Sequence, residues 1–242
     1  ANVKASYGSW AKTRLEGDVQ GALTEGLNAR AVLVKEDKDS YLDRYNHDKT
    51  VGYVVASAAL TDNTQLTFGH STQDSEGNGG MWGALTLHYG DGSRIDYDRS
   101  ASTSANWSYW QVKDNRSFVE LAHQLNDDWK AGFNYNEQHG KNEYDDAYEQ
   151  APAQPSDQFR VSSASSFLQG QINDTWNSRL ELGQSYDRNK AVGAAMPWNN
   201  GLNATTRHSA SWLNRLDLNP ANQLTLGGDW YEDKLDSSTA YA

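Results

Sequence analysis

The fold is decided by residues 126–136, which read Asn-Asp-Asp-Trp-Lys-Ala-Gly-Phe-Asn-Tyr-Asn. The first three residues have the composition of a tight reversal, because Asn and Asp side chains hydrogen-bond to nearby backbone groups in turns. From Trp129 onwards every second residue is apolar, and the positions between are occupied by the polar or small residues Lys130, Gly132 and Asn134. A period of two predicts a β-strand with one apolar and one polar face.

Similar segments recur along the chain, and the connections between them are sorted by length. Tight reversals are predicted at residues 61–63, 126–128, 173–175 and 219–222, and long connections at about 36–49, 73–107, 137–157 and 187–207. This sorting is typical of transmembrane β-barrels, whose periplasmic turns are short and whose extracellular loops are long. The sequence therefore predicts an all-β fold: an antiparallel transmembrane β-barrel, or a segment of one, with about 11–12 strands.

The composition is hydrophilic, with a mean hydropathy of -0.84, 37% hydrophobic residues and a net charge of -11. A barrel tolerates this composition because only alternate strand positions face lipid. No segment approaches the roughly 18 consecutive apolar residues that a spanning helix needs, which excludes a helical membrane protein. A soluble β-sandwich or solenoid shows the same alternation and stays an alternative. The absence of cysteine excludes disulfides and thiolate sites.

The positions of the aromatic residues favour the barrel. Trp129 and Trp176 directly follow short turns, whereas Tyr135, Tyr186 and Trp230 come about six to ten residues later on their strands. At about 3.3 Å per residue, this spacing gives two aromatic girdles at the two surfaces of a bilayer. Loop lengths indicate that the first strand, 3–9, and the last, 223–233, both rise toward the outer surface. An odd number of strands cannot close a fully antiparallel barrel, so we expect a segment of a larger barrel or an unusual closure.

A series of motifs runs through the first 148 residues: Tyr7-Gly-Ser-Trp10, Asp18-Val-Gln-Gly-Ala-Leu23, Asp39-Ser-Tyr-Leu-Asp-Arg-Tyr45, Met81-Trp-Gly-Ala-Leu85, Tyr89-Gly-Asp-Gly-Ser-Arg94 and Trp107-Ser-Tyr-Trp110. Together they resemble the barrel of TonB-dependent siderophore receptors of the ferric-coprogen and ferripyoverdine type.

From about residue 159 two further motifs are similar instead to the cobalamin-receptor branch of that superfamily: Leu180-Glu-Leu-Gly-Gln-Ser-Tyr-Asp-Arg-Asn189 and Leu224-Thr-Leu-Gly-Gly-Asp-Trp230. The change falls at the Pro-, Gln- and Ala-rich stretch 150–155, which makes a chimera or an engineered barrel one interpretation. We expect residues 1–242 to form a single barrel region, with siderophore-receptor-like strands in 1–150 and cobalamin-receptor-like strands in 151–242.

The resemblance implies the barrel portion of an outer-membrane receptor that takes up a metal chelate, namely a ferric siderophore. Such receptors contact TonB through an N-terminal plug domain, and we expect no plug within residues 1–242. The expected partners are therefore outer-membrane lipid and the chelate, with TonB reached only through a plug. A plugless or engineered passive pore and a soluble β-rich binding module are the alternative functions.

The sequence shows no arrangement of residues that indicates catalysis. It lacks a nucleophile–base motif, a His-Glu-x-x-His motif and a phosphate-binding glycine loop, and its six histidines do not have metal-ligand spacing. We therefore predict no enzymatic activity, no metal site and no cofactor apart from an iron-siderophore ligand. The carboxylates of the acidic loops around Asp39 and Asp96 are of the kind that binds calcium, although acidic loops that only contact solvent are commoner. The acidic balance argues against nucleic-acid binding.

Binding residues are predicted in the longest loop and its flanks, because aromatic rings stack on large chelates and an arginine pairs with their anionic groups. The candidates are Trp82, Tyr89, Arg94, Tyr97, Trp107 and Trp110. An upper aromatic girdle is the alternative role for the last two. Charged residues at the polar strand positions are predicted to line the lumen: Arg14, Glu16, Asp18, Arg116, Glu120, Arg179, Glu181, Arg215 and Asp217. The opposite positions are predicted to face lipid: Leu66, Phe68, Ala131, Phe133, Leu180, Leu182, Leu224 and Leu226.

Overall fold

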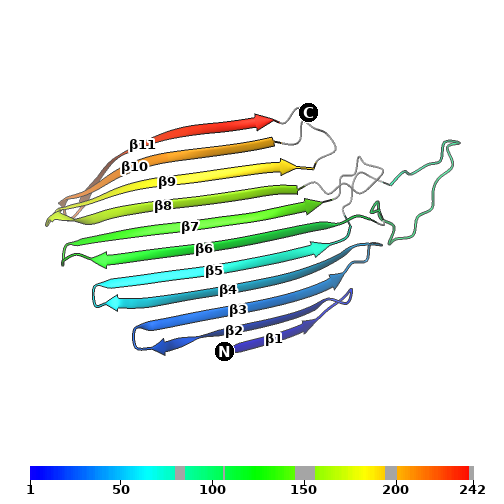
Figure 1. Ribbon diagram of the computed structural model, residues 1–242, viewed down its shortest axis with the longest axis horizontal. Helices are drawn as coiled ribbons and strands as arrows, with labels where there is room; N and C mark the ends of the chain where they lie inside the picture. Colours follow the sequence, from blue (N-terminus) through cyan, green and yellow to red (C-terminus); the bar gives the residue numbers. More distant parts are fainter. Residues whose placement is uncertain (80–84, 106, 145–155, 194–200, 240–242) are drawn as a thin grey trace.

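In the computed structural model the chain forms one sheet of eleven strands, in which neighbours in sequence pair with each other (Figure 1). The structure describes residues 1–79, 85–105, 107–144, 156–193 and 201–239. The strands are β1 (Asn2–Tyr7), β2 (Thr13–Thr24), β3 (Leu27–Asp39), β4 (Asn46–Thr61), β5 (Thr64–Gly77), β6 (Trp110–Gln124), β7 (Trp129–Tyr144), β8 (Ser156–Asn173), β9 (Trp176–Val192), β10 (Gly201–Asn219) and β11 (Asn222–Thr239). Every pairing is antiparallel, which confirms the predicted fold class. Within the described ranges, no helix has the length and apolar character to cross a membrane.

Short turns lie at one end of the sheet and longer connections at the other (Figure 1). The turns at 62–63, 125–128, 174–175 and 220–221 are the predicted ones, and a further turn at 25–26 joins β2 to β3. Most predicted bounds of the long connections were too wide: β3 continues to Asp39 and β4 begins at Asn46, for example, although the connection before β6 ends two residues later than predicted. The strand ends near these connections are polar on both faces, so their sequence loses the period of two although the backbone hydrogen bonds continue.

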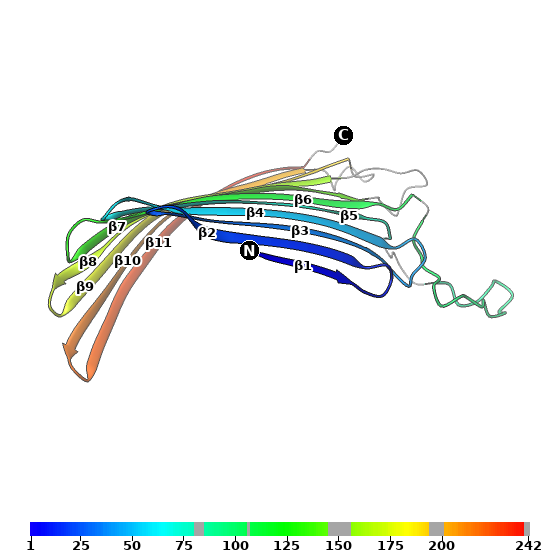
Figure 2. The ribbon, with the colours of Figure 1, turned by 90° about the horizontal axis from the view of Figure 1, so that it is seen from below.

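The pairing register sorts the side chains onto two faces of the sheet, and Figure 2 shows that the sheet is curved. One row across the sheet joins Leu66, Leu121 and Phe133 through direct cross-strand pairing. All eight residues predicted to face lipid lie on this face, which we call the apolar face. All nine residues predicted to line the lumen lie on the other, the polar face. Register also resolves segment 50–60, whose orientation the sequence left open, because Ala56 pairs with Phe68 on the apolar face.

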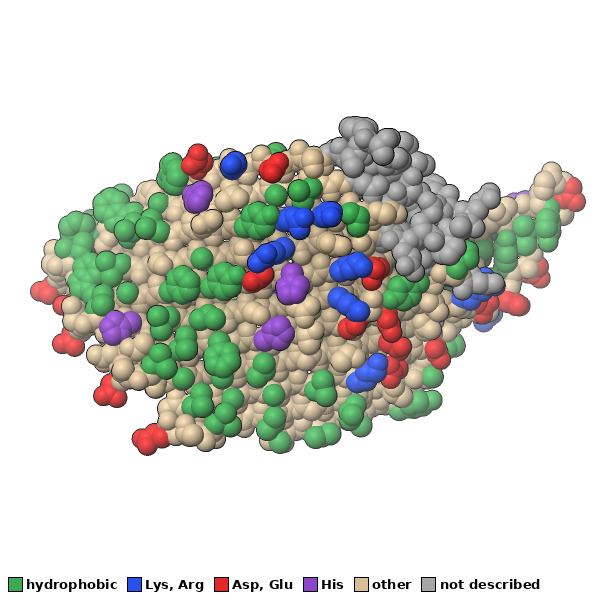
Figure 3. Space-filling view, viewed as in Figure 1, with side chains coloured by type: hydrophobic (Ala, Val, Ile, Leu, Met, Phe, Trp, Pro, Cys, Tyr) green, Lys and Arg blue, Asp and Glu red, His purple; other side chains and the backbone are tan. Residues whose placement is uncertain are grey.

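The apolar face is not covered by a second layer of described residues. Phe68, Leu182 and Trp230 are 47%, 54% and 55% exposed, and the only buried apolar side chains in the described ranges are Val34, Ala56 and Ala204. Figure 3 shows apolar side chains spread over this face toward the short-turn end of the sheet. A soluble sandwich would bury such a face against a second sheet. A single curved sheet with an exposed apolar face is instead the structure expected of a barrel wall in lipid.

Three phenylalanines depart from the apolar face and lie on the polar one. Phe118, Phe159 and Phe167 each lie over a glycine of the neighbouring strand, and a Cβ added to Gly132 would be 2.3 Å from the Phe167 ring. Each ring covers backbone that its cross-strand glycine leaves bare, an arrangement that stabilises glycines within sheets.

Candidate functional site

The long-loop end of β1–β6 carries a packed rim, defined here as residues 8–12, 40–45, 78–79, 98–105 and 107–110. The backbone N–H of Asp39 donates to the carbonyl of Trp10 at 2.9 Å, and the ring of Trp10 lies 5.9 Å from that of Tyr41. Trp10 is 57% exposed and Tyr41 56% exposed. Trp10 also has a φ of 62°, a left-handed conformation that costs a residue with a side chain free energy. The turn that carries Trp10 is therefore hydrogen-bonded to the end of β3, and its ring contacts that of Tyr41.

Loop 40–45 fixes the segment that precedes β6. The Arg44 guanidinium donates from Nη1 to the Ser104 carbonyl at 2.8 Å, although the two residues are 60 positions apart in sequence. The N–H of Asp43 donates to the Ser100 carbonyl at 2.7 Å, and the Ser102 hydroxyl donates to the Asp43 carbonyl at 2.7 Å. The rim is thus a surface at which the β1–β2, β3–β4 and β5–β6 connections contact one another.

Two glycines let the chain leave β5 close to these loops. A Cβ at Gly77 would lie 2.2 Å from the carbonyl oxygen of Asn46, and one at Gly79 would lie 2.4 Å from the Tyr45 ring. Gly79 has a φ of 97°, which favours glycine, and its N–H donates to the buried Ser108 hydroxyl at 3.1 Å. No other residue type fits these positions without displacing the rim.

Beyond the rim, residues 87–95 form a small hairpin that extends past the sheet (Figure 1). The N–H of Tyr89 donates to the Ser93 carbonyl at 2.8 Å, and that of Ile95 donates to the Leu87 carbonyl at 2.9 Å. The Asp91 carboxylate accepts from the Ser93 hydroxyl at 2.6 Å and from its N–H at 2.9 Å. These hydrogen bonds lower the pKa of Asp91 and keep the turn closed.

The structure divides the six predicted ligand-binding residues between the hairpin and the rim. Tyr89, Arg94 and Tyr97 are exposed on or just after the hairpin, and Trp107 is 37% exposed at the rim. Trp110 begins β6 on the polar face, where its ring lies 5.3 Å from that of His47. Trp82 lies outside the described residues.

The sequence interpretation missed several rim residues. Trp10, Tyr41 and Tyr45 appeared in motifs that were used only for the family resemblance. The signal that could have found them is an aromatic residue inside a connection between strands. Tyr109, next to Trp110, is partly buried, and this burial, with the nearby Glu76 carboxylate, raises the pKa of its phenol.

Ion pairs cover much of the polar face. Arg14 of β2 pairs with Glu36 of the neighbouring strand β3 at 3.1 Å and with Glu16 of its own strand at 3.0 Å. Five of the other predicted residues also form ion pairs: Asp18 with Arg30 at 2.9 Å, Arg179 with Glu181 at 2.8 Å and Arg215 with Asp217 at 3.6 Å. Arg116 and Glu120 form no ion pair with a described residue. Glu36 and Arg30 were not predicted, because their pairing depends on register.

The structure gives no indication of a metal centre in the part of the chain that it describes, where no three His, Asp or Glu side chains cluster suitably. Two histidines of the apolar face have hydroxyl partners instead. His70 Nδ1 lies 2.9 Å from the Ser117 hydroxyl and His123 Nδ1 lies 2.8 Å from the Thr64 hydroxyl.

Similar proteins identify the fold. No family model matches the chain. It is 36% identical over 131 residues to the ferripyoverdine receptor of Pseudomonas aeruginosa and 32% identical over 132 residues to the ferric-pyoverdine 358 receptor of Pseudomonas putida. These matches cover 53% and 54% of this chain, but the chain spans only 16% of either relative.

Solved structures match nearly the whole chain. The ferripyoverdine receptor of the P. aeruginosa outer membrane, bound to ferripyoverdine, superposes with a TM-score of 0.78 at 22% identity over 98% of this chain and 37% of the receptor. The alcaligin outer-membrane receptor of Bordetella pertussis gives a TM-score of 0.71 at 19% identity, over 98% of this chain and 36% of the receptor. The cobalamin-receptor likeness of residues 159–242 stays a prediction, as does the change at 150–155, which lies outside the described residues. The chain therefore has the fold of the barrel of TonB-dependent siderophore receptors of the bacterial outer membrane, and over about half of its length it resembles ferripyoverdine receptors in sequence.

Proposed function

We propose that this chain supplies part of the wall and outer rim of an outer-membrane receptor that takes up a ferric siderophore. The observation that carries the proposal is the combination of the receptor-barrel fold over nearly the whole chain with 36% identity to a ferripyoverdine receptor. The apolar face would lie against lipid, and the polar face would line the lumen. Iron enters as part of the ligand, the strands have no catalytic role, and contact with TonB is made by a plug and not by this sheet.

Ligand contact is assigned to the hairpin and the rim. Tyr89 is 59% exposed and Tyr97 40% exposed, so both offer rigid aromatic area to a large chelate. Arg94 is exposed on the same hairpin and can donate two parallel hydrogen bonds to an anionic group. We assign ligand contact to Trp82 as well, because it lies in the same connection between β5 and β6 in the sequence.

Binding of a ferric hydroxamate siderophore to the purified chain tests this assignment. Arg94→Ala should weaken binding at least about tenfold, because a hydrogen bond to a charged group contributes about 1.5–3 kcal/mol. Trp82→Ala and Tyr89→Ala should also weaken binding. Thr86→Ala, an exposed change in the same loop, is the matched control and should have no effect. Unchanged affinity in all three variants, or no binding by the parent chain, would remove the assignment.

The passive pore is the weaker alternative. A pore requires a closed wall, whereas β1 and β11 are the two edges of an open sheet and do not pair with each other in the described residues. An open edge exposes unpaired N–H and C=O groups, which lipid cannot satisfy.

A further inference from the structure

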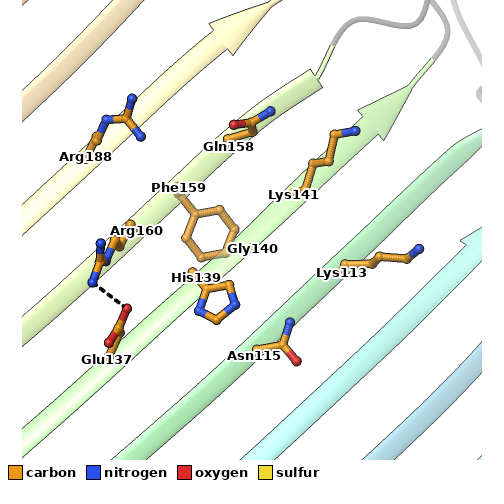
Figure 4. Close-up of a pocket in the computed structure, with 10 residues that line it drawn as sticks. All are labelled: Lys113, Asn115, Glu137, His139, Gly140, Lys141, Gln158, Phe159, Arg160 and Arg188. Carbon is orange, nitrogen blue, oxygen red and sulfur yellow. Dashed lines mark ion pairs between the residues drawn. The ribbon is translucent and has the colours of Figure 1, made fainter.

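The apolar face carries a group of cations near the long-loop end of β6–β9 (Figure 3). We call Lys113, Lys141, Arg160 and Arg188 the basic patch. They line a shallow pocket of about 520 Å³, together with His139 and Glu137 (Figure 4). The chain as a whole is acidic, with a net charge of -11, so a cluster of four cations is not expected from its composition.

The register places like charges directly opposite each other twice within the basic patch. Lys113 pairs with Lys141 between β6 and β7, and Arg160 pairs with Arg188 between β8 and β9. Like charges in direct cross-strand pairs destabilise a sheet. Two such pairs in adjacent rows of one face therefore create a repulsion that anionic groups nearby would reduce.

Carboxylates of the chain neutralise the basic patch only in part. Arg160 pairs with Glu137 at 2.9 Å and Lys113 reaches Asp74 at 3.6 Å, while Lys141 pairs with Glu143. Arg188 has no ion pair with any described residue. Arg160 and Lys113 also remain 55% and 50% exposed, so both are accessible to a ligand.

The height of the basic patch on the strands indicates the kind of anion. A tilted strand crosses the apolar part of a bilayer in about 9–11 residues, so a crossing that begins at Trp129 ends near His139 on β7. Below that level the same face presents Phe133 and Leu182, which are 39% and 54% exposed. A ligand at this position would have its charge beside the cations and its apolar chains beside the residues below.

We propose that the basic patch binds the phosphate groups of a lipid in the outer leaflet of the membrane. The inference goes beyond chelate uptake, because the site lies on the opposite face from the lumen, and it rests on the proposed membrane orientation of the sheet. Basic side chains at a membrane surface bind anionic headgroups. A free phosphate ion lacks the apolar chains that the surface beneath would contact.

The test measures lipid binding by native mass spectrometry of the full chain in zwitterionic detergent. The probe is a diphosphorylated disaccharide lipid of the bacterial outer leaflet, compared with the same lipid without phosphates and with inorganic phosphate. Loss of two cations in Lys113→Gln/Arg188→Gln should weaken binding of the diphosphorylated lipid about 30-fold. Lys130→Gln is the matched control, because Lys130 is an exposed cation on the polar face of β7, and it should bind like the parent.

A second readout separates binding from a structural role. Without lipid, the double variant should unfold at the same temperature as the parent or a higher one, since each substitution removes one member of a like-charge pair. The Lys113–Asp74 ion pair that is also lost is half exposed and contributes little to stability. The diphosphorylated lipid should raise the unfolding temperature of the parent and not that of the variant. Equal binding of the dephosphorylated lipid, displacement of the lipid by equimolar inorganic phosphate, or equal binding by parent and variant would each overturn the proposal. Failure of siderophore binding leaves this result unaffected, so the two proposals are tested separately.

Discussion

Phe133→Arg tests which face of the sheet meets lipid. Phe133 is the fourth residue after Trp129 and is 39% exposed on the apolar face, between Leu121 and Ser166 of the neighbouring strands. At about 3.3 Å per residue and a strand tilt of about 40°, it lies roughly 10 Å above the Trp129 girdle. That position is close to the middle of an apolar band about 25 Å tall. An arginine there should lower the free energy of unfolding by about 2–4 kcal/mol.

The matched control is Asn134→Arg, which adds the same side chain one residue further along β7. Asn134 lies on the polar face directly opposite Glu120, so the new cation would meet water and a carboxylate. Its effect should be within about 0.5 kcal/mol of zero. Both variants are unfolded by denaturant from detergent micelles, with tryptophan fluorescence as the readout. If Asn134→Arg proved the more damaging of the two, the assignment of the faces would be inverted.

Two further predictions concern the rim and the sheet edges. Gly79→Ala forces a side chain toward the Tyr45 ring, so a protease should cut the rim faster than in the parent. The control is Gly90→Ala, which has open space around its Cβ position and should leave the cleavage rate unchanged. Equal cleavage rates in the parent and both variants would contradict the packing described for the rim. In planar bilayers the chain alone should give no persistent conductance steps, because its sheet is open, and stable steps with a modest cation preference would instead support the plugless pore.

The sequence predicted the fold because lipid imposes a simple pattern on a barrel strand. Phe133 and Asn134 lie on opposite faces of the sheet and differ in polarity, and that difference repeats along most strands. The pattern fails where both faces meet water. The long connection predicted at 187–207 includes residues that the structure assigns to β9 and β10, since Arg188 and Asp187 are both polar although they lie on opposite faces. Backbone hydrogen bonding continues there without any signal in the side chains.

Sites built across strands were harder to predict than the strands themselves. The contact between Arg44 and Ser104 joins loops 60 residues apart, and nothing in either loop indicates the other. The basic patch has the same origin, because Lys113 and Arg188 each look like an ordinary cation at a strand end. Only the register of β6–β9 shows that they share one face and that each opposes another cation. The exposure of the hairpin residues Tyr89 and Arg94 was easier to predict, since composition alone indicates a polar loop with aromatic residues, and their role in binding stays a prediction.

Strand direction limits how this sheet can become part of a closed wall. With eleven antiparallel strands, β1 and β11 run the same way, as their arrows show in Figure 1. If these two edges paired directly, the pairing would be parallel. In a ring of two copies related by an axis through the pore, β11 of each copy would meet β1 of the other, and both of these pairings would also be parallel. Antiparallel closure instead needs an odd number of strands between β11 and β1, with the first and last running opposite to both edges. A receptor wall that combines this sheet with such a set of strands meets that condition, whereas a pore made from one or two copies of the sheet does not.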